Sequence, residues 1–106
     1  MTPDMLTDTE LAGQRLMVGF DGVEMNADLK WLIRDLNVGG LILFSRNIES
    51  PDQVRRLCRE AQSQAACAGI PPLLIAVDQE GGIVSRLKPP FTQFSGNPAM
   101  KNSSDA

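Results

Sequence analysis

Two carboxylates, those of Asp78 and Glu80, follow directly on the apolar run at residues 73–77 and stand just before Gly81 and Gly82. A carboxylate at the end of a strand can accept charge-assisted hydrogen bonds from the hydroxyl groups of a sugar. On an extended backbone the two side chains point the same way, with Cα atoms about 6.6 Å apart. The glycines allow the chain to turn sharply beside a ligand. This pattern predicts a polar binding site in which Asp78 is the first candidate.

The same residues also allow a purely structural interpretation. Asp78 would then cap the amides of the glycine pair, and Glu80 would pair with Arg86. The two carboxylates do not suit the catalytic pair of a retaining glycosidase, although their spacing can approach the required separation of about 5 Å between carboxyl groups. Such a pair must flank the scissile bond, whereas neighbours on one strand approach a substrate from one side. The spacing therefore leaves a binding role and a structural role open and excludes that catalytic role.

Arg46 and Asn47 follow a second apolar run at residues 41–44, and Asp21 follows a further run at residues 17–20. Because the carboxyl ends of parallel strands meet at one edge of a sheet, these side chains are expected on the same rim as Asp78. They could contact a polar ligand there or support the loops through hydrogen bonds to the backbone. Support of the loops is the interpretation that we favour.

The composition narrows the chemistry that the chain can perform. Its 106 residues contain no histidine, which excludes a Ser-His or Cys-His nucleophilic pair and a histidine-bearing metal site within the chain. The formal net charge is −3 and the pI is about 4.8, so no basic stripe is available for nucleic acid or for an anionic membrane. The glycine pair is a weak candidate for a phosphate cradle, since neither G-x-G-x-x-G nor a Walker lysine accompanies it.

The two cysteines, Cys58 and Cys67, both fall within one expected helix. A separation of nine residues places them about 13 Å apart along a helix, whereas a disulfide needs Cα atoms within about 7 Å. Free thiols are typical of a reducing compartment. The N-terminal residues show no basic or apolar leader, and no apolar run approaches the length of about 20 residues that a membrane span needs. We therefore expect a cytoplasmic protein.

Hydrophobic periodicity and capping signals predict an alternation of helices and strands. Helices are expected at residues 8–16, 27–36 and 51–68, and strands at residues 17–20, 41–44 and 73–78. The third helix has the clearest limits. Ser50 is its expected N-cap, Pro51 occupies its first position and Gln53 completes a capping box. Gly69 is its expected C-cap.

This alternation predicts an α/β fold with right-handed crossovers and a parallel sheet. The continuous apolar run at residues 73–77 predicts a strand that is buried on both faces of the sheet. Residues 83–87 are expected as a short strand or a turn, and residues 88–106 as a loop whose last part, residues 101–106, frays. Three parallel strands would expose apolar residues and unpaired backbone groups at both edges, so further chain is expected to cover them.

The string at residues 39–44 followed by Arg46 and Asn47, together with the pattern D-x-E-G-G-x-V-x-R at residues 78–86, resembles glycoside hydrolase family 3. Within this family the chain most resembles the bacterial β-N-acetylhexosaminidase type. The resemblance covers nearly the whole chain from about Leu11 onward. One departure is Ile83, which stands where the family commonly has arginine.

The resemblance implies a partial (β/α)8 TIM barrel, of which residues 1–106 supply about the first three βα units. A complete barrel takes about 250 residues. The resemblance also implies a retaining mechanism without cofactor or metal, whose aspartate nucleophile and histidine-aspartate acid/base pair lie beyond the matched region. Asp78 matches the family aspartate that binds hydroxyl groups of the terminal sugar in the −1 subsite. Glu80, Gly81, Gly82 and Arg86 match the motif and are expected to support the loop.

The expected function is that of the N-terminal part of a β-N-acetylhexosaminidase, which removes terminal N-acetylglucosamine from an amino-sugar oligosaccharide, as in peptidoglycan recycling. Because the nucleophile and the acid/base are missing, the chain alone is expected to be inactive; general acid catalysis by itself contributes about 10²- to 10⁴-fold. Two alternatives stay open. One is a non-catalytic α/β module that holds a sugar at Asp78, and the other is an interaction module whose sheet edge is completed by another chain.

Overall fold

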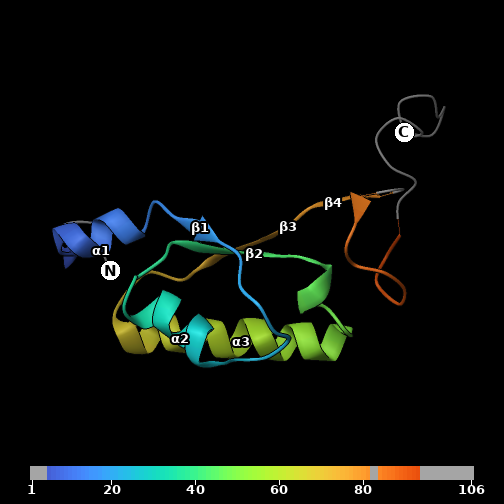
Figure 1. The fold of residues 1–106 in the computed structure, drawn as a ribbon, viewed down its shortest axis with the longest axis horizontal. Helices are drawn as coiled ribbons and strands as arrows, with labels where there is room; N and C mark the ends of the chain where they lie inside the picture. Colours follow the sequence, from blue (N-terminus) through green and yellow to red (C-terminus); the bar gives the residue numbers. More distant parts are fainter. Residues whose placement is uncertain (1–4, 82–83, 94–106) are drawn as a thin grey trace.

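The computed structural model describes residues 5–81 and 84–93, and Figure 1 shows their arrangement. The elements in chain order are α1 (Asp8–Gly13), β1 (Met17–Val18), α2 (Ala27–Arg34), β2 (Gly40–Leu43), the 3₁₀ turn η2 (Ser45–Asn47), α3 (Pro51–Ala68), β3 (Leu74–Val77), β4 (Gln79–Gly81) and β5 (Val84–Ser85). The alternation of α1 to β3 confirms the order of helices and strands that the sequence predicts.

Helix α3 begins and ends where its capping residues predict. The hydroxyl of Ser50 accepts a hydrogen bond from the backbone N–H of Gln53 at 3.1 Å, and the Gln53 side chain closes the capping box. At the other end Gly69 takes the left-handed conformation with φ of 74°. Because these signals act between residues close in sequence, they are sufficient to set both limits of the helix.

Helices α1 and α2 end earlier than predicted, at Gly13 and Arg34. Asn37 accounts for the end of α2. Its backbone lies in the left-handed region with φ of 58°, and its Nδ2 atom donates to the carbonyl oxygens of Ile33 and Arg34 at 3.3 and 3.2 Å. Asparagine enters this region more readily than most residues. A side chain therefore satisfies the last carbonyl groups in place of a further helical turn.

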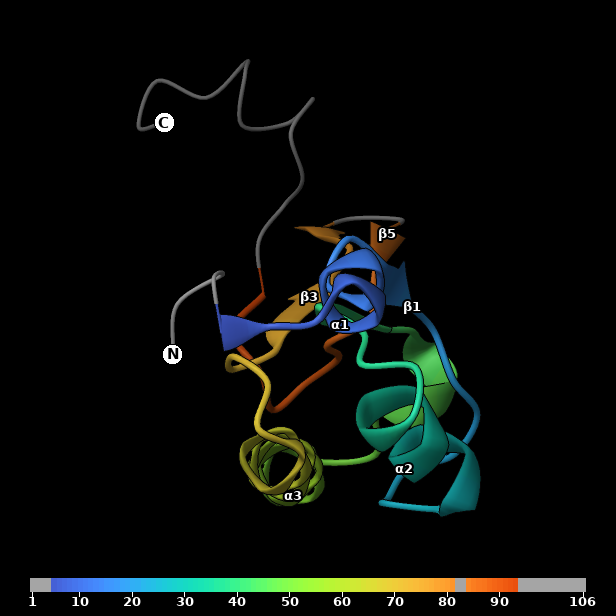
Figure 2. The same cartoon turned by 90° about the vertical axis from the view of Figure 1, so that its left-hand side faces the viewer.

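Strands β1, β2 and β3 form a parallel sheet in this order, so neighbours in the sheet are also neighbours along the chain. Helices α2 and α3 both lie on one face of this sheet (Figures 1 and 2). In a doubly wound fold the helices cover both faces, whereas in a β/α barrel they form a single outer layer. The parallel sheet with its helices confirms the predicted α/β class, and its single layer of helices agrees with a segment of a barrel.

The prediction that the strand at residues 73–78 is buried on both faces is wrong for the described structure. Strand β3 lies at the edge of the three-stranded sheet, and its Leu74 side chain is 71% exposed. Ile75 and Val77 pack against the core on the helix side. Strand alternation then puts Leu74 and Ala76 on the opposite face. Within the described residues no helix covers that face, which is why Leu74 is accessible to solvent (Figure 1).

After β3 the chain leaves the parallel sheet and forms an antiparallel hairpin of β4 and β5. The sequence predicts a short strand or a turn at residues 83–87. The structure has the strand β5 in this segment. The pairing shifts between Gln79 and Gly81, so Glu80 is an extra residue in β4, a β-bulge. Ile83 lies outside the described residues, and so do residues 94–106 with the predicted frayed end.

The backbone of α1 approaches the turn between α2 and β2 so closely that position 13 has no room for a side chain. A Cβ atom on Gly13 would lie 2.2 Å from the carbonyl oxygen of Leu36 and 2.6 Å from that of Asn37. Both are backbone atoms, and the N–H of Gly39 also donates to the Gly13 carbonyl at 3.1 Å. We expect Gly13→Ala to lower the free energy of unfolding by about 1–3 kcal/mol, as at other overpacked sites.

Urea denaturation followed by circular dichroism measures this change in the free energy of unfolding. Ala12→Ser is the matched control, because Ala12 precedes Gly13 in the same helix and is exposed. Its effect is expected to stay within about 0.5 kcal/mol. Equal stability of the two variants would contradict the close backbone approach.

Candidate functional site

The three parallel strands run in the same direction (Figure 1), and polar residues follow the carboxyl end of each. We call this set the polar edge; it consists of Asp21, Arg46, Asn47 and Asp78. The first belongs to the loop after β1, the next two to η2 after β2, and the last follows β3. Since β2 and β3 pair up to their final residues, Phe44 and Asp78 are the next positions on neighbouring strands.

Asn47 is fully buried and connects the ends of β1 and β2. Its Nδ2 atom donates to the carbonyl oxygens of Phe20 at 3.0 Å and Gly22 at 2.8 Å, and its Oδ1 atom accepts from the Phe44 N–H at 2.9 Å. A buried amide whose groups are all paired in this way holds the loop conformation. The geometry of Asn47 is that of a support for the polar edge.

Arg46 lies across the same two strand ends, but nearer to solvent. Its Nε atom forms an ion pair with the Asp21 carboxylate at 2.9 Å and donates to the Phe20 carbonyl at 3.2 Å. The guanidinium also stands 4.9 Å from the centre of the Phe44 ring. Because the Arg46 and Asp21 side chains are 52% and 91% exposed, solvent screens the ion pair and its contribution to stability is small. The contacts fix the direction of the guanidinium.

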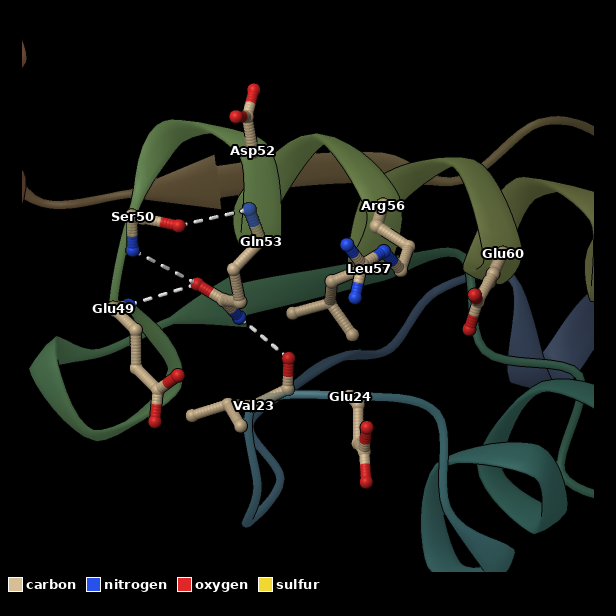
Figure 3. A pocket seen from close by; sticks show the side chains of 9 residues that line it. All are labelled: Val23, Glu24, Glu49, Ser50, Asp52, Gln53, Arg56, Leu57 and Glu60. Carbon is tan, nitrogen blue, oxygen red and sulfur yellow. Dashed lines mark hydrogen bonds between the residues drawn. The ribbon is translucent and has the colours of Figure 1, made fainter.

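Gln53 joins the loops that follow β1 and β2 (Figure 3). Its Nε2 atom donates to the carbonyl oxygen of Val23 in the first loop and, at 2.9 Å, to that of Asn47 in the second. Its Oε1 atom accepts from the Glu49 N–H at 2.8 Å. The sequence marks Gln53 only as a capping residue. Its contact with Val23, 30 residues earlier, depends on the tertiary structure and has no local signal.

A surface cavity of about 280 Å³ lies between these loops and the first half of α3 (Figure 3). Val23 and the buried Leu57 supply apolar lining, and Glu24, Glu49 and Glu60 contribute carboxylates. None of the residues of the polar edge lines it. The cavity therefore belongs to the helix side of the sheet and is separate from Asp78.

Asp78 is exposed and directly follows the last residue of β3. Strand alternation places it with Leu74 and Ala76 on the face that α2 and α3 leave uncovered. In a β/α barrel this face is the inner one, and substrates bind at the carboxyl ends of the strands. Asp78 thus combines the two positional features that a barrel requires of a residue that contacts substrate.

The described residues do not show the structural alternative for the two carboxylates. Glu80 is exposed and forms no ion pair with Arg86. The described hydrogen bonds include none from the Gly81 N–H to Asp78, and Gly82 lies outside the residues that the structure describes. The bulge at Glu80 also interrupts the alternation on which a common direction of both carboxylates depends.

Gln79, which no local sequence pattern marks, holds the β4–β5 hairpin. Its Oε1 atom accepts from the N–H groups of Arg86 at 2.8 Å and Leu87 at 2.9 Å. Its Nε2 atom donates to the Ser85 hydroxyl at 2.8 Å and the Leu87 carbonyl at 3.2 Å. Within the described part of the chain, the buried Nε atom of Arg86 has no hydrogen-bond partner. Gly81 has φ of 80°, which explains why the motif has glycine there.

Other chemistry-bearing groups lie away from the polar edge. Cys58 and Cys67 are both free, and burial raises the pKa of the Cys58 thiol, which keeps it protonated near neutral pH. Over residues 5–81 and 84–93, no three cysteine, aspartate or glutamate side chains gather in a way that could hold a metal ion. None of the helices in the same ranges combines the length and the hydrophobicity needed to span a bilayer.

Parallel β/α units in chain order, with helices on one face and an exposed aspartate after the carboxyl end of β3, are the features of a segment of a β/α barrel. Residues 7–106 match the Glycosyl hydrolase family 3 N terminal domain. The chain belongs to this family, which confirms the resemblance seen in the motif at residues 78–86.

The chain is similar to curated proteins described as beta-hexosaminidase. One from Pseudomonas aeruginosa (strain UCBPP-PA14) is 46% identical over 91 residues, which make up 85% of this chain and 25% of that protein. One from Alkalilimnicola ehrlichii is 45% identical over 79 residues, or 74% of this chain and 22% of that protein. The chain thus spans about a quarter of the length of the curated relatives that it matches.

Solved structures show the same relationship. A glycoside hydrolase family 3 beta-N-acetylglucosaminidase from Paenibacillus sp. str. FPU-7 matches with a TM-score of 0.87 and 45% identity, over 90% of this chain and 18% of that one. NagZ from Neisseria gonorrhoeae, in complex with N-trifluoroacetyl-D-glucosamine, matches with a TM-score of 0.65 and 33% identity, over 74% of this chain and 22% of that one. The β-N-acetylhexosaminidase branch of the family is therefore the one that this chain resembles.

Proposed function

We propose that the chain is the N-terminal part of the catalytic barrel of a retaining β-N-acetylhexosaminidase, in which Asp78 binds hydroxyl groups of the terminal N-acetylglucosamine. The observation that carries this proposal is the exposed position of Asp78 directly after the last residue of β3. Continued strand alternation directs its carboxylate to the face without helices. The amino-sugar ligand of the similar Neisseria gonorrhoeae structure supports a sugar as the substrate.

In the proposed complete enzyme, ionised Asp78 accepts hydrogen bonds from the sugar hydroxyls. Hydrogen bonds to a charged group contribute about 1.5–3 kcal/mol each, enough to orient the sugar ring at the reacting carbon. Glu80, Gly81, Gly82 and Arg86 support the loop around Asp78, and Arg46 and Asn47 support the neighbouring rim. The nucleophile and the acid/base come from chain beyond these residues, and the remainder of the barrel covers the edges of the sheet.

We further propose cytoplasmic peptidoglycan recycling as the setting of this activity. Free Cys58 and Cys67 support a reducing compartment, because thiols there stay unpaired. The acidic balance of the chain supports a sugar rather than nucleic acid or an anionic membrane as its partner. Assays with muropeptides and with chitin oligosaccharides on the complete enzyme would distinguish the two sources of terminal N-acetylglucosamine.

The purified 106-residue chain is expected to show no turnover of 4-nitrophenyl N-acetyl-β-D-glucosaminide. It lacks the proposed nucleophile and acid/base, and general acid catalysis alone contributes about 10²- to 10⁴-fold. The release of 4-nitrophenol measures this activity, with the complete enzyme as the positive control. Real turnover by the short chain would contradict the assignment of the reactive groups to other parts of the protein.

The exposed edge at β3 favours one second candidate, an interaction module whose sheet is completed by another chain. Such a module would hold its partner by strand pairing at the edge and would not depend on Asp78. Titration calorimetry with N-acetylglucosamine and light scattering of the same sample separate the candidates. A stable, well-dispersed monomer of the 106-residue chain would count against the interaction module and also against the fragment of a barrel.

A further inference from the structure

We propose that Gln79 is a positioning residue of the sugar site, which holds the β4–β5 hairpin so that Asp78 and Arg86 keep a fixed relative placement. This inference rests on the proposed function, because it concerns the same site. In this role Gln79 acts through its neighbours and does not contact the sugar.

The Gln79 amide uses its complete hydrogen-bonding capacity within the hairpin. An amide side chain can accept two hydrogen bonds and donate two. Its oxygen accepts from the consecutive N–H groups of Arg86 and Leu87, at 2.8 and 2.9 Å. Its nitrogen donates to Ser85 Oγ at 2.8 Å and to the Leu87 carbonyl at 3.2 Å. Four bonds to three consecutive residues allow one rotamer only.

The hairpin needs this support because its own pairing is short. Among the described residues of the hairpin, the pairs Gln79–Ser85 and Gly81–Val84 join its two strands, and the bulge at Glu80 lies between them. Two-stranded hairpins are marginally stable at best without further contacts. The side chain of Gln79 adds four hydrogen bonds between β4 and residues 85–87.

Two charged side chains share this anchor. Asp78 is covalently adjacent to Gln79, and the backbone N–H of Arg86 is hydrogen-bonded to the Gln79 oxygen. Asp78 is exposed beside β3, and the buried Nε atom of Arg86 has no hydrogen-bond partner within the described residues. A displacement of about 1 Å in a binding group can lower the rate of a reaction about 100-fold. Loss of the anchor is therefore expected to affect the reaction more than the fold.

The chain offers a matched control in Gln62. Its Nε2 atom donates to the Leu73 carbonyl at 2.9 Å, and its Oε1 atom accepts from the Leu73 N–H at 2.8 Å. Gln62, like Gln79, thus bonds backbone groups through both its amide oxygen and its amide nitrogen. Its partner Leu73 stands just before the amino end of β3, at the opposite end of the strand from Asp78. Replacement of Gln62 therefore tests what a lost amide does to stability alone.

The experiment compares Gln79→Met, Gln79→Glu and Gln62→Met in the complete enzyme, with 4-nitrophenyl N-acetyl-β-D-glucosaminide as substrate. Gln79→Met keeps the length of the side chain without its hydrogen bonds, and it is expected to lower kcat/KM about 10- to 100-fold. Gln79→Glu keeps an acceptor for the N–H groups of Arg86 and Leu87 but has no donor for the Leu87 carbonyl, so its kcat/KM should lie between those of Gln79→Met and the wild type. Gln62→Met should lower the thermal midpoint by a similar amount as Gln79→Met with kcat/KM unchanged.

Equal kcat/KM of Gln79→Met and Gln62→Met would overturn the inference. If Gln79→Met does not fold, Ser85→Ala removes a single partner of the Gln79 amide. Its kcat/KM is then expected to fall about threefold to tenfold, and an unchanged value would equally overturn the inference. Failure of the proposed function has a different signature, namely a complete wild-type enzyme that does not cleave the substrate at all.

Discussion

Asp78→Asn in the complete enzyme is expected to lower kcat/KM for an N-acetyl-β-D-glucosaminide by about one to two orders of magnitude or more, with the fold intact. The substitution keeps the shape of the side chain and removes a charged acceptor, whose hydrogen bonds contribute about 1.5–3 kcal/mol each. Because Asp78 is exposed and follows the last residue of β3, its replacement leaves no buried group among residues 5–81 and 84–93 without a partner. Steady-state kinetics measures the loss, and the thermal midpoint verifies the fold.

Asp28→Asn is the control for this substitution. This substitution changes the net charge by the same amount as Asp78→Asn. Asp28 lies in the first turn of α2, where it is exposed on the helix side of the sheet. Its kcat/KM is expected to equal that of the wild type, so that net charge alone does not explain an effect at position 78. Unchanged kinetics of Asp78→Asn would mean that Asp78 is structural, and the proposed sugar site would then be wrong.

Asn47→Ala is expected to lower the free energy of unfolding by about 2–4 kcal/mol, the largest effect on stability that we predict. The side chain is fully buried, and its removal leaves the N–H of Phe44 and the carbonyl of Gly22 without the partners that lie at 2.9 and 2.8 Å. An unsatisfied buried group costs about 1–3 kcal/mol. Denaturation by urea measures the change.

Asp21→Asn, in the neighbouring loop after β1, provides the contrast. It weakens the ion pair with Arg46, whose two side chains are largely open to solvent, and exposed pairs contribute about 0–1 kcal/mol. Asn47→Ala should therefore destabilise the protein clearly more than Asp21→Asn does, although the ion pair is the more visible interaction. The reverse order would contradict the assignment of Asn47 as the main connection between the ends of β1 and β2.

Helix limits and family membership followed from the sequence wherever the signals were local. Ser50, Gln53 and Gly69 set both ends of α3 because each cap acts within a few residues of its own position. The sequence does not predict the early end of α2. Asn37 ends this helix through its left-handed backbone and its hydrogen bonds to the carbonyl groups of Ile33 and Arg34, and no local pattern indicates either feature. The prediction that β3 is buried on both faces was wrong, because an apolar run does not indicate which faces of the sheet the rest of the chain covers.

The sequence by itself determined the alternation of helices and strands, the parallel sheet and the motif at residues 78–86, because period, caps and motif spacing are properties of neighbouring residues. Only the tertiary structure decided that helices cover a single face of the sheet and that a bulge interrupts β4. It alone also decided the partners of Gln79 and Asn47 and the contact of Gln53 with Val23. An amide can bond any backbone group within its reach, and which groups come within reach depends on how the loops meet after folding.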